Sequence, residues 1–125
     1  MELESGRVNS YREALVLVRL GDGATIECVV DTGFDGGLML PRAFVSQIQI
    51  PIIGELTFEM VGGAKMSAEI GITNIKWLGE LHEVEVIVSE SDDALIGTEL
   101  LMATTLIIGL PANTLTISTH EEPAA

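Results

Sequence analysis

The chain has 125 residues and a formal net charge of −13, from six basic and nineteen acidic side chains. A chain of this length builds one domain, and its negative field argues against binding to nucleic acid or to an anionic membrane surface. Hydrophobic residues make up 47% of the sequence, yet no apolar run approaches the roughly 20 residues of a membrane-spanning helix. We therefore expect one soluble domain over residues 1–125, with a core from about 12 to 117 and frayed acidic ends.

The number of cysteines and the composition of the N-terminal segment bear on the cellular compartment of the protein. Cys28 is the only cysteine, so no intrachain disulfide can form, which fits a reducing cytoplasm. We interpret Cys28 as a small buried strand residue. The segment MELESGRVNS is acidic and polar and resembles neither a secretory signal nor a basic transit peptide. Acids near both ends are expected to be solvated and mobile: Glu2, Glu4, Glu121 and Glu122.

The first half of the chain predicts a hairpin followed by a helix. Residues 13–20 are rich in branched side chains, residues 21–23 (GDG) form a turn, and residues 24–30 return as a second strand. This hairpin leads directly to Asp31. Proline favours the first position of a helix, so Pro41 predicts a short helix at the start of PRAFVSQIQI.

The second half predicts further short strands with glycine-rich turns. The expected strands are 54–60, 65–78, 82–90 and 94–97, then a helical turn or two over 98–103 and a closing hairpin over 105–119. The tip of the longest hairpin is Val61-Gly62-Gly63-Ala64. Trp77 is interpreted as a core residue. The pattern is typical of an all-β small barrel or sandwich.

One short segment carries the candidate chemistry. In VVDTGFDGGLMLP, residues 29–41, the triplet Asp31-Thr32-Gly33 lies in a glycine-containing bend between two apolar strands. The triplet alone is weak evidence for a function, because it occurs by chance in roughly a few per cent of chains of this length. An aspartate in a loop commonly accepts hydrogen bonds from nearby backbone N–H groups and does nothing else. The surrounding pattern favours a catalytic acid.

This segment, together with ALIGTELL at 94–101, resembles the retropepsin-like aspartic proteases. More narrowly it resembles the small bacterial and archaeal members that carry Asp-Thr-Gly-Phe, and the resemblance extends over about residues 12–117. It implies an all-β fold, a retropepsin-like acid-protease half-barrel with one short C-terminal helix. Because the chain has one such triplet, the resemblance also implies completion as a two-fold homodimer.

The resemblance assigns catalytic roles to Asp31, Thr32 and Gly33. Two Asp31 carboxyls, one from each subunit, would lie about 3 Å apart and share one proton, as aspartic proteases in general do. The ionised one would activate a water, and the protonated one would polarise the scissile carbonyl. Thr32 would hydrogen-bond across the dimer, and Gly33 would take the turn and let the substrate approach closely.

The resemblance also implies a substrate-binding set. Its members are Phe34, Asp35, Gly36, Met60, Val61, Gly62 and Gly63. The first three would form the floor beside the catalytic acid, and Val61, Gly62 and Gly63 a flap that closes over an extended peptide. Met60 would present an apolar contact near this flap. Met66 would add an apolar contact near the flap. The segment LIG, residues 95–97, would pack behind the active-site loop as a scaffold.

Other catalytic chemistries find little support. His82 and His120 have no second histidine or cysteine at ligand spacing, so we expect no metal, and no other cofactor. The serines lack a nucleophile-elbow context. No glycine-rich segment leads through a lysine into a helix, as a phosphate loop requires.

Two functions therefore remain open. The first is an aspartic endopeptidase that acts as a homodimer on a peptide or protein substrate. The alternative is a protease-like module that binds a peptide or protein without turnover. The triplet at Asp31 favours the enzyme. The alternative is favoured by Thr98, which stands where retroviral members typically have an arginine paired with the acid matching Asp35, and by the acidic ends, which would repel each other in a dimer.

Overall fold

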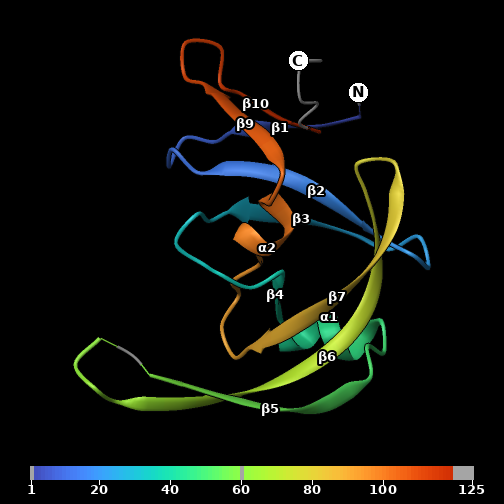
Figure 1. Cartoon of the computed structure of the whole chain (residues 1–125), viewed down its shortest axis with the longest axis vertical. Coiled ribbons are helices and arrows are strands. Elements are labelled where there is room, and N and C mark those ends of the chain that lie inside the picture. Colours follow the sequence, from blue (N-terminus) through green and yellow to red (C-terminus); the bar gives the residue numbers. More distant parts are fainter. Residues whose placement is uncertain (1, 60, 120–125) are drawn as a thin grey trace, which may run out of the picture.

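The computed structural model describes residues 2–59 and 61–119 (Figure 1). The strands are β1 (Leu3–Val8), β2 (Ala14–Leu20), β3 (Thr25–Val30), β4 (Leu38–Pro41), β5 (Ile52–Glu59), β6 (Lys65–Trp77), β7 (Glu80–Ser89), β8 (Leu95–Ile96), β9 (Thr104–Gly109) and β10 (Thr114–Thr119). The helices are α1 (Arg42–Gln47) and α2 (Thr98–Leu101). The predicted all-β class is confirmed. No helix in these residues is long and apolar enough to cross a membrane.

All ten strands belong to one sheet, in the order β5-β6-β7-β4-β8-β3-β2-β1-β10-β9. An additional pairing joins β6 to β2, with Leu20 opposite Ile75. Because these strands lie far apart in the sheet order, their pairing curls the sheet around its apolar face. The β5–β6 hairpin reaches out at one end of the molecule, and the β9–β10 hairpin lies at the other (Figure 1).

The core consists of the inward-facing residues of the curled sheet. In β2, buried Val16, Val18 and Leu20 alternate with exposed Leu17 and Arg19, the period of two expected for a strand with one buried face. The largest fully buried side chains are Trp77, Leu38, Leu40, Ile75, Ile96, Leu115 and Ile117. Trp77 is a core residue, as expected, and its Nε1 donates a hydrogen bond of 3.1 Å to the Leu100 carbonyl.

Most predicted elements are present near their predicted positions. The turn at residues 21–23, the hairpin tip at 61–64 and the closing hairpin around Pro111–Asn113 all connect the expected strands. The predicted first helix forms as α1, but it begins at Arg42, with Pro41 as its extended N-cap. Since proline lacks a backbone N–H, it fits this position without losing a helical hydrogen bond.

The N-terminal expectation was wrong. Residues 3–8, expected to be frayed, form β1 and are hydrogen-bonded to β2 on one side and β10 on the other. Backbone pairing rather than burial holds this strand, and Gly6 makes it possible: a Cβ there would lie 1.9 Å from the Leu15 carbonyl oxygen. Glu4, expected to be mobile, accepts a 2.9 Å hydrogen bond from the Leu78 N–H. Glu121 and Glu122 lie outside the described residues.

Cys28 provides a first test of the fold. The residue is fully buried, and burial, with a smaller effect of Glu27, raises the pKa of its thiol to about 12. Since the thiolate is the reactive form, we expect native protein to resist iodoacetamide at pH 8 and to react fully in denaturant, as measured by intact mass. Labelling at equal rates in both conditions would contradict this packing.

The same thiol makes stability depend on pH. Its ordinary pKa is 9.0 and its folded pKa is higher, so the unfolded chain releases this proton first. The contribution of Cys28 to stability is therefore complete below about pH 9 and is lost as the pH rises toward the folded pKa.

Candidate active site

Asp31 lies where β3 ends, at the start of the loop of residues 31–37 that leads into β4. The short strand β8 separates β3 from β4: it pairs in parallel with β3, Val30 opposite Ile96, and antiparallel with β4. The Asp31 N–H continues the first of these ladders with a 2.9 Å bond to the Ile96 carbonyl. The backbone of Asp31 is therefore fixed by the sheet itself.

Backbone hydrogen bonds hold the rest of the loop against the segment that follows β8. The Phe34 carbonyl accepts from the Thr98 N–H at 2.8 Å and from the Thr98 hydroxyl at 3.3 Å. The Gly97 N–H donates to the Gly37 carbonyl at 3.0 Å. In this chain the segment at 95–97 does pack behind the loop, as predicted. Thr98 uses its side chain for this contact and makes none with Asp35 in the described residues.

The Asp31 carboxylate is half-buried and is oriented by its own loop. Its Oδ1 accepts a 2.9 Å hydrogen bond from the Gly33 N–H, and no other donor within residues 2–59 and 61–119 reaches it. Its Oδ2 is therefore available to a substrate, a water or a partner group. Thr32 is exposed, and its hydroxyl has no hydrogen-bond partner in the same residues.

Gly33 is needed for space and not for its backbone conformation. Its φ is not in the left-handed region, so the turn itself does not require glycine, contrary to part of the expectation. A Cβ at this position would lie 3.2 Å from Asp31 Oδ1, tight enough to disturb the carboxylate. The absence of a side chain at Gly33 therefore leaves room for the acid, and the close approach of a substrate at Gly33 stays a prediction.

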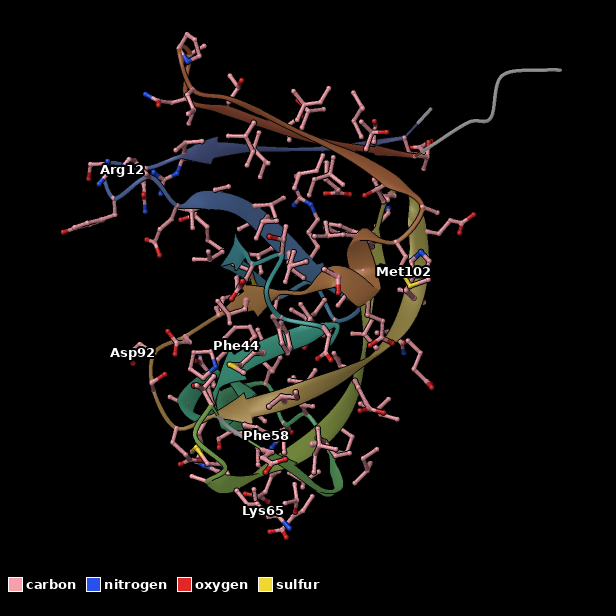
Figure 2. The ribbon with its side chains drawn as sticks, turned by 60° about the vertical axis from the view of Figure 1, so that its left-hand side comes forward. Arg12, Phe44, Phe58, Lys65, Asp92 and Met102 are labelled. Carbon is pink, nitrogen blue, oxygen red and sulfur yellow. The ribbon has the colours of Figure 1, made fainter. Side chains whose placement is uncertain are left out.

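A cavity of about 410 Å³ opens beside this loop. It is lined by Gly33, Phe34, Asp35, Met39, Leu56, Phe58, Glu59 and Ile87. The loop of residues 31–37 forms one wall and β5 forms the other, and Figure 1 shows the β5–β6 hairpin reaching out below the loop. In Figure 2 Phe58 is seen directly below β7, which contributes Ile87.

The predicted substrate-binding residues fall into four groups. Phe34 and Asp35 line the cavity, whereas Gly36 lies against the Phe34 ring, which a Cβ at Gly36 would approach within 2.6 Å. Gly62 and Gly63 form the hairpin tip with φ of 98° and 89°, values that favour glycine. Val61 beside them is fully exposed. Met60 lies outside the described residues.

Five further cavity residues were not singled out from the sequence: Met39, Leu56, Phe58, Glu59 and Ile87. The alternation of side chains along β4 and β5 could have identified the apolar residues among them. Met39 lies between buried Leu38 and Leu40, so it must face the other side of β4. Leu56 and Phe58 alternate with charged and polar neighbours along an exposed strand, which indicates apolar side chains directed at something other than the core.

A second cavity, of about 270 Å³, adjoins the first and shares Met39, Phe58 and Ile87 with it. Met66 lines this second cavity, consistent with the apolar contact expected near the flap. Across residues 2–59 and 61–119, no three histidine, cysteine, aspartate or glutamate residues gather in a way that would hold a metal ion.

The sequence matches no protein-family model, and no curated protein matches it. The structure does match solved proteins. A retropepsin-like aspartic protease from Rickettsia conorii matches with a TM-score of 0.70 and 15% identity, over 92% of this chain and 89% of that chain. EIAV protease, solved with the inhibitor HBY-793, matches with a TM-score of 0.60 and 19% identity, over 74% of this chain and 88% of that one.

The protease of simian foamy virus (mac) also matches, with a TM-score of 0.53 and 20% identity, over 70% of this chain and 90% of that one. At these identities the likeness concerns the fold. The chain has the retropepsin-like fold predicted from its sequence.

Proposed function

We propose that the chain is an aspartic endopeptidase that works as a homodimer. The observation that carries this proposal is the placement of Asp31 on a retropepsin-like fold. Sheet pairing fixes its backbone, the Gly33 N–H orients its carboxylate, and the loop that carries it lines a cavity through Gly33, Phe34 and Asp35. An acid held in this way, in a loop that forms one wall of a cavity, is suited to proton transfer.

The reaction proposed is hydrolysis of a peptide bond by water. Two Asp31 carboxyls, one from each subunit, share one proton, since two adjacent like charges cannot both remain ionised. The ionised carboxylate takes a proton from the attacking water while the protonated carboxyl donates a hydrogen bond to the scissile carbonyl. The new C–O bond gives a tetrahedral intermediate, which collapses as the amine leaves with a proton.

A second subunit is part of this proposal because one chain supplies one Asp31. Closed two-fold symmetry brings two copies of the same loop together with the fewest kinds of contact. The exposed, unpartnered hydroxyl of Thr32 is available for a hydrogen bond between the loops. We assign no cofactor. The single buried cysteine supports work in a reducing cytoplasm.

The experiment that tests the proposal is digestion of a diverse peptide mixture by purified protein from pH 3 to 8, read by mass spectrometry. We expect internal cuts with a bell-shaped dependence on pH, because the pair must hold one proton. Specific activity should fall when the protein is diluted until the dimer dissociates, as followed by sedimentation. Protein that is folded and dimeric yet makes no cut at any pH would contradict the proposal.

One observation favours the alternative, a peptide- or protein-binding module. The hydrogen bond from the Gly33 N–H to Asp31 is also what an ordinary turn aspartate makes. In that case the cavity beside the loop binds an extended segment, and the same peptide mixture would be retained by the protein without being cut.

A further inference from the structure

The cavity lined by Gly33, Phe34 and Asp35 combines an apolar interior with unpaired negative charge. Its walls include Met39, Phe58 and Ile87, and its rim carries Asp35 from the loop and Glu59 from the end of β5. Both acids are exposed, and neither has an ion-pair or hydrogen-bond partner among the described residues. Lys65 lies opposite Glu59 in the hairpin register, but no ion pair joins them.

The adjoining cavity provides a contrast within the same molecule. Its one acid, Glu90, is paired with Arg42, whose Nε donates to it at 2.8 Å. That hydrogen bond holds the pKa of Glu90 below its usual value. Free negative charge therefore distinguishes the cavity next to Gly33 from its neighbour, although the two share three apolar residues.

We propose that this cavity selects a lysine or arginine side chain of the peptide, so that the substrate class is a basic peptide. The methylene stem of such a side chain packs on Met39 and Ile87, while its charged head reaches Asp35 and Glu59 at the rim. The face of the Phe58 or Phe34 ring adds a cation–π contact. The inference rests on the proposed function for the identity of the occupant as a peptide substrate.

The net charge of the chain also supports a cationic occupant. The chain carries a net charge of −13, so its long-range field attracts basic peptides. Side chains two positions apart in an extended peptide point the same way, so the adjoining apolar cavity accepts a large apolar side chain from the same substrate.

The test measures binding so that it does not depend on turnover. A randomised decapeptide library is incubated with folded Asp31→Asn protein, and the retained peptides are sequenced by mass spectrometry. We expect enrichment of lysine and arginine. Retention without any basic enrichment would overturn the inference, even if the wild-type protein cleaves peptides. Enrichment of lysine and arginine in the retained peptides, together with no cleavage by the wild-type protein, would support the inference and contradict the enzyme proposal.

Matched variants assign the selectivity to the two acids. One retained peptide is compared with its copy in which norleucine replaces lysine, a change that keeps the stem and removes the charge. Asp35→Asn and Glu59→Gln should each reduce the ratio of the two affinities by roughly 1.5- to 5-fold, the range for exposed ion pairs. Glu55→Gln removes the same charge from the same strand outside the cavity and should leave the ratio unchanged.

Two results would contradict this assignment. One is an equal loss of the ratio in the Glu55→Gln control, which would make the preference a general effect of net charge. The other is a weaker dimer in Asp35→Asn or Glu59→Gln with an unchanged ratio, which would mean that these acids meet the partner subunit and not a peptide. Sedimentation of each variant distinguishes that case.

Discussion

Replacement of Asp31 by asparagine is expected to remove peptide cleavage, with kcat/KM lower by at least about 10²- to 10⁴-fold, the contribution typical of a general acid–base group. Asparagine has the same shape and can still accept the Gly33 N–H bond, but its amide neither takes a proton from water nor shares one with the second subunit. The loss should therefore appear in kcat, with binding of a peptide largely retained.

Asp22→Asn is the matched control. Asp22 also lies in a turn, and its Oδ1 accepts a 2.9 Å hydrogen bond from the Ala24 N–H, so the two aspartates make the same type of local contact. We expect full activity from the Asp22 variant. Equal cleavage by the Asp31 variant, from preparations free of contaminating protease, would show that Asp31 is a structural turn residue.

A mixture of wild-type and Asp31→Asn protein tests whether two subunits share one active site. Wild-type subunits that exchange with an excess of Asp31→Asn subunits pair mostly with an inactive copy. Activity per wild-type chain should then fall toward zero as the excess grows. Activity that stays proportional to the wild-type chain alone would indicate that each subunit works independently.

Gly97→Ala is expected to destabilise the protein strongly. A Cβ at Gly97 would lie 2.2 Å from the Gly36 carbonyl oxygen and 2.6 Å from that of Phe34. Both contacts are with backbone atoms, which cannot rotate away as a side chain would. Either the loop of residues 31–37 or the start of α2 must move, at a cost of about 1–3 kcal/mol or more.

Because that loop carries Asp31, the same substitution should also reduce activity in protein that remains folded. Denaturant unfolding measured by the fluorescence of the single, buried Trp77 gives the change in free energy. Gly54→Ala is the control: its nearest neighbour is 4.0 Å away, and its effect should stay within about 0.5 kcal/mol. Equal stability of the two variants would contradict the tight contact at Gly97.

The fold was largely predictable because the strands alternate and the turns carry glycine. Val16, Val18 and Leu20 share the buried face of β2, although the apolar neighbours Leu15 and Leu17 make the alternation imperfect. The exception was β1, whose sequence LESGRV has neither a sustained apolar face nor a turn signal. The position of β1 depends on hydrogen bonding to β2 and β10. Because β10 comes more than 100 residues later in the chain, this pairing leaves no recognisable pattern in residues 3–8 themselves.

The candidate site was predictable where it depends on neighbours in sequence. Asp31, Thr32 and Gly33 form one loop, and their placement follows from the strands on either side. The opposite wall of the cavity was not predictable in this way, because Leu56 and Phe58 come close to Phe34 only through the curl of the sheet. Hydrogen-bond partners distant in sequence were equally unpredictable. The Thr98 hydroxyl, for example, donates to the carbonyl of Phe34, 64 positions earlier in the chain.

The sequence separation between Phe34 and Thr98 affects the order in which parts of the domain can fold. The loop that carries Asp31 obtains its support from β8 and from Thr98, segments made long after it during synthesis. Pairings so distant in sequence close slowly, since chain entropy must be lost before they form. A growing chain therefore emerges with its acid unsupported, and any activity must wait until the second half of the domain has folded back onto the first.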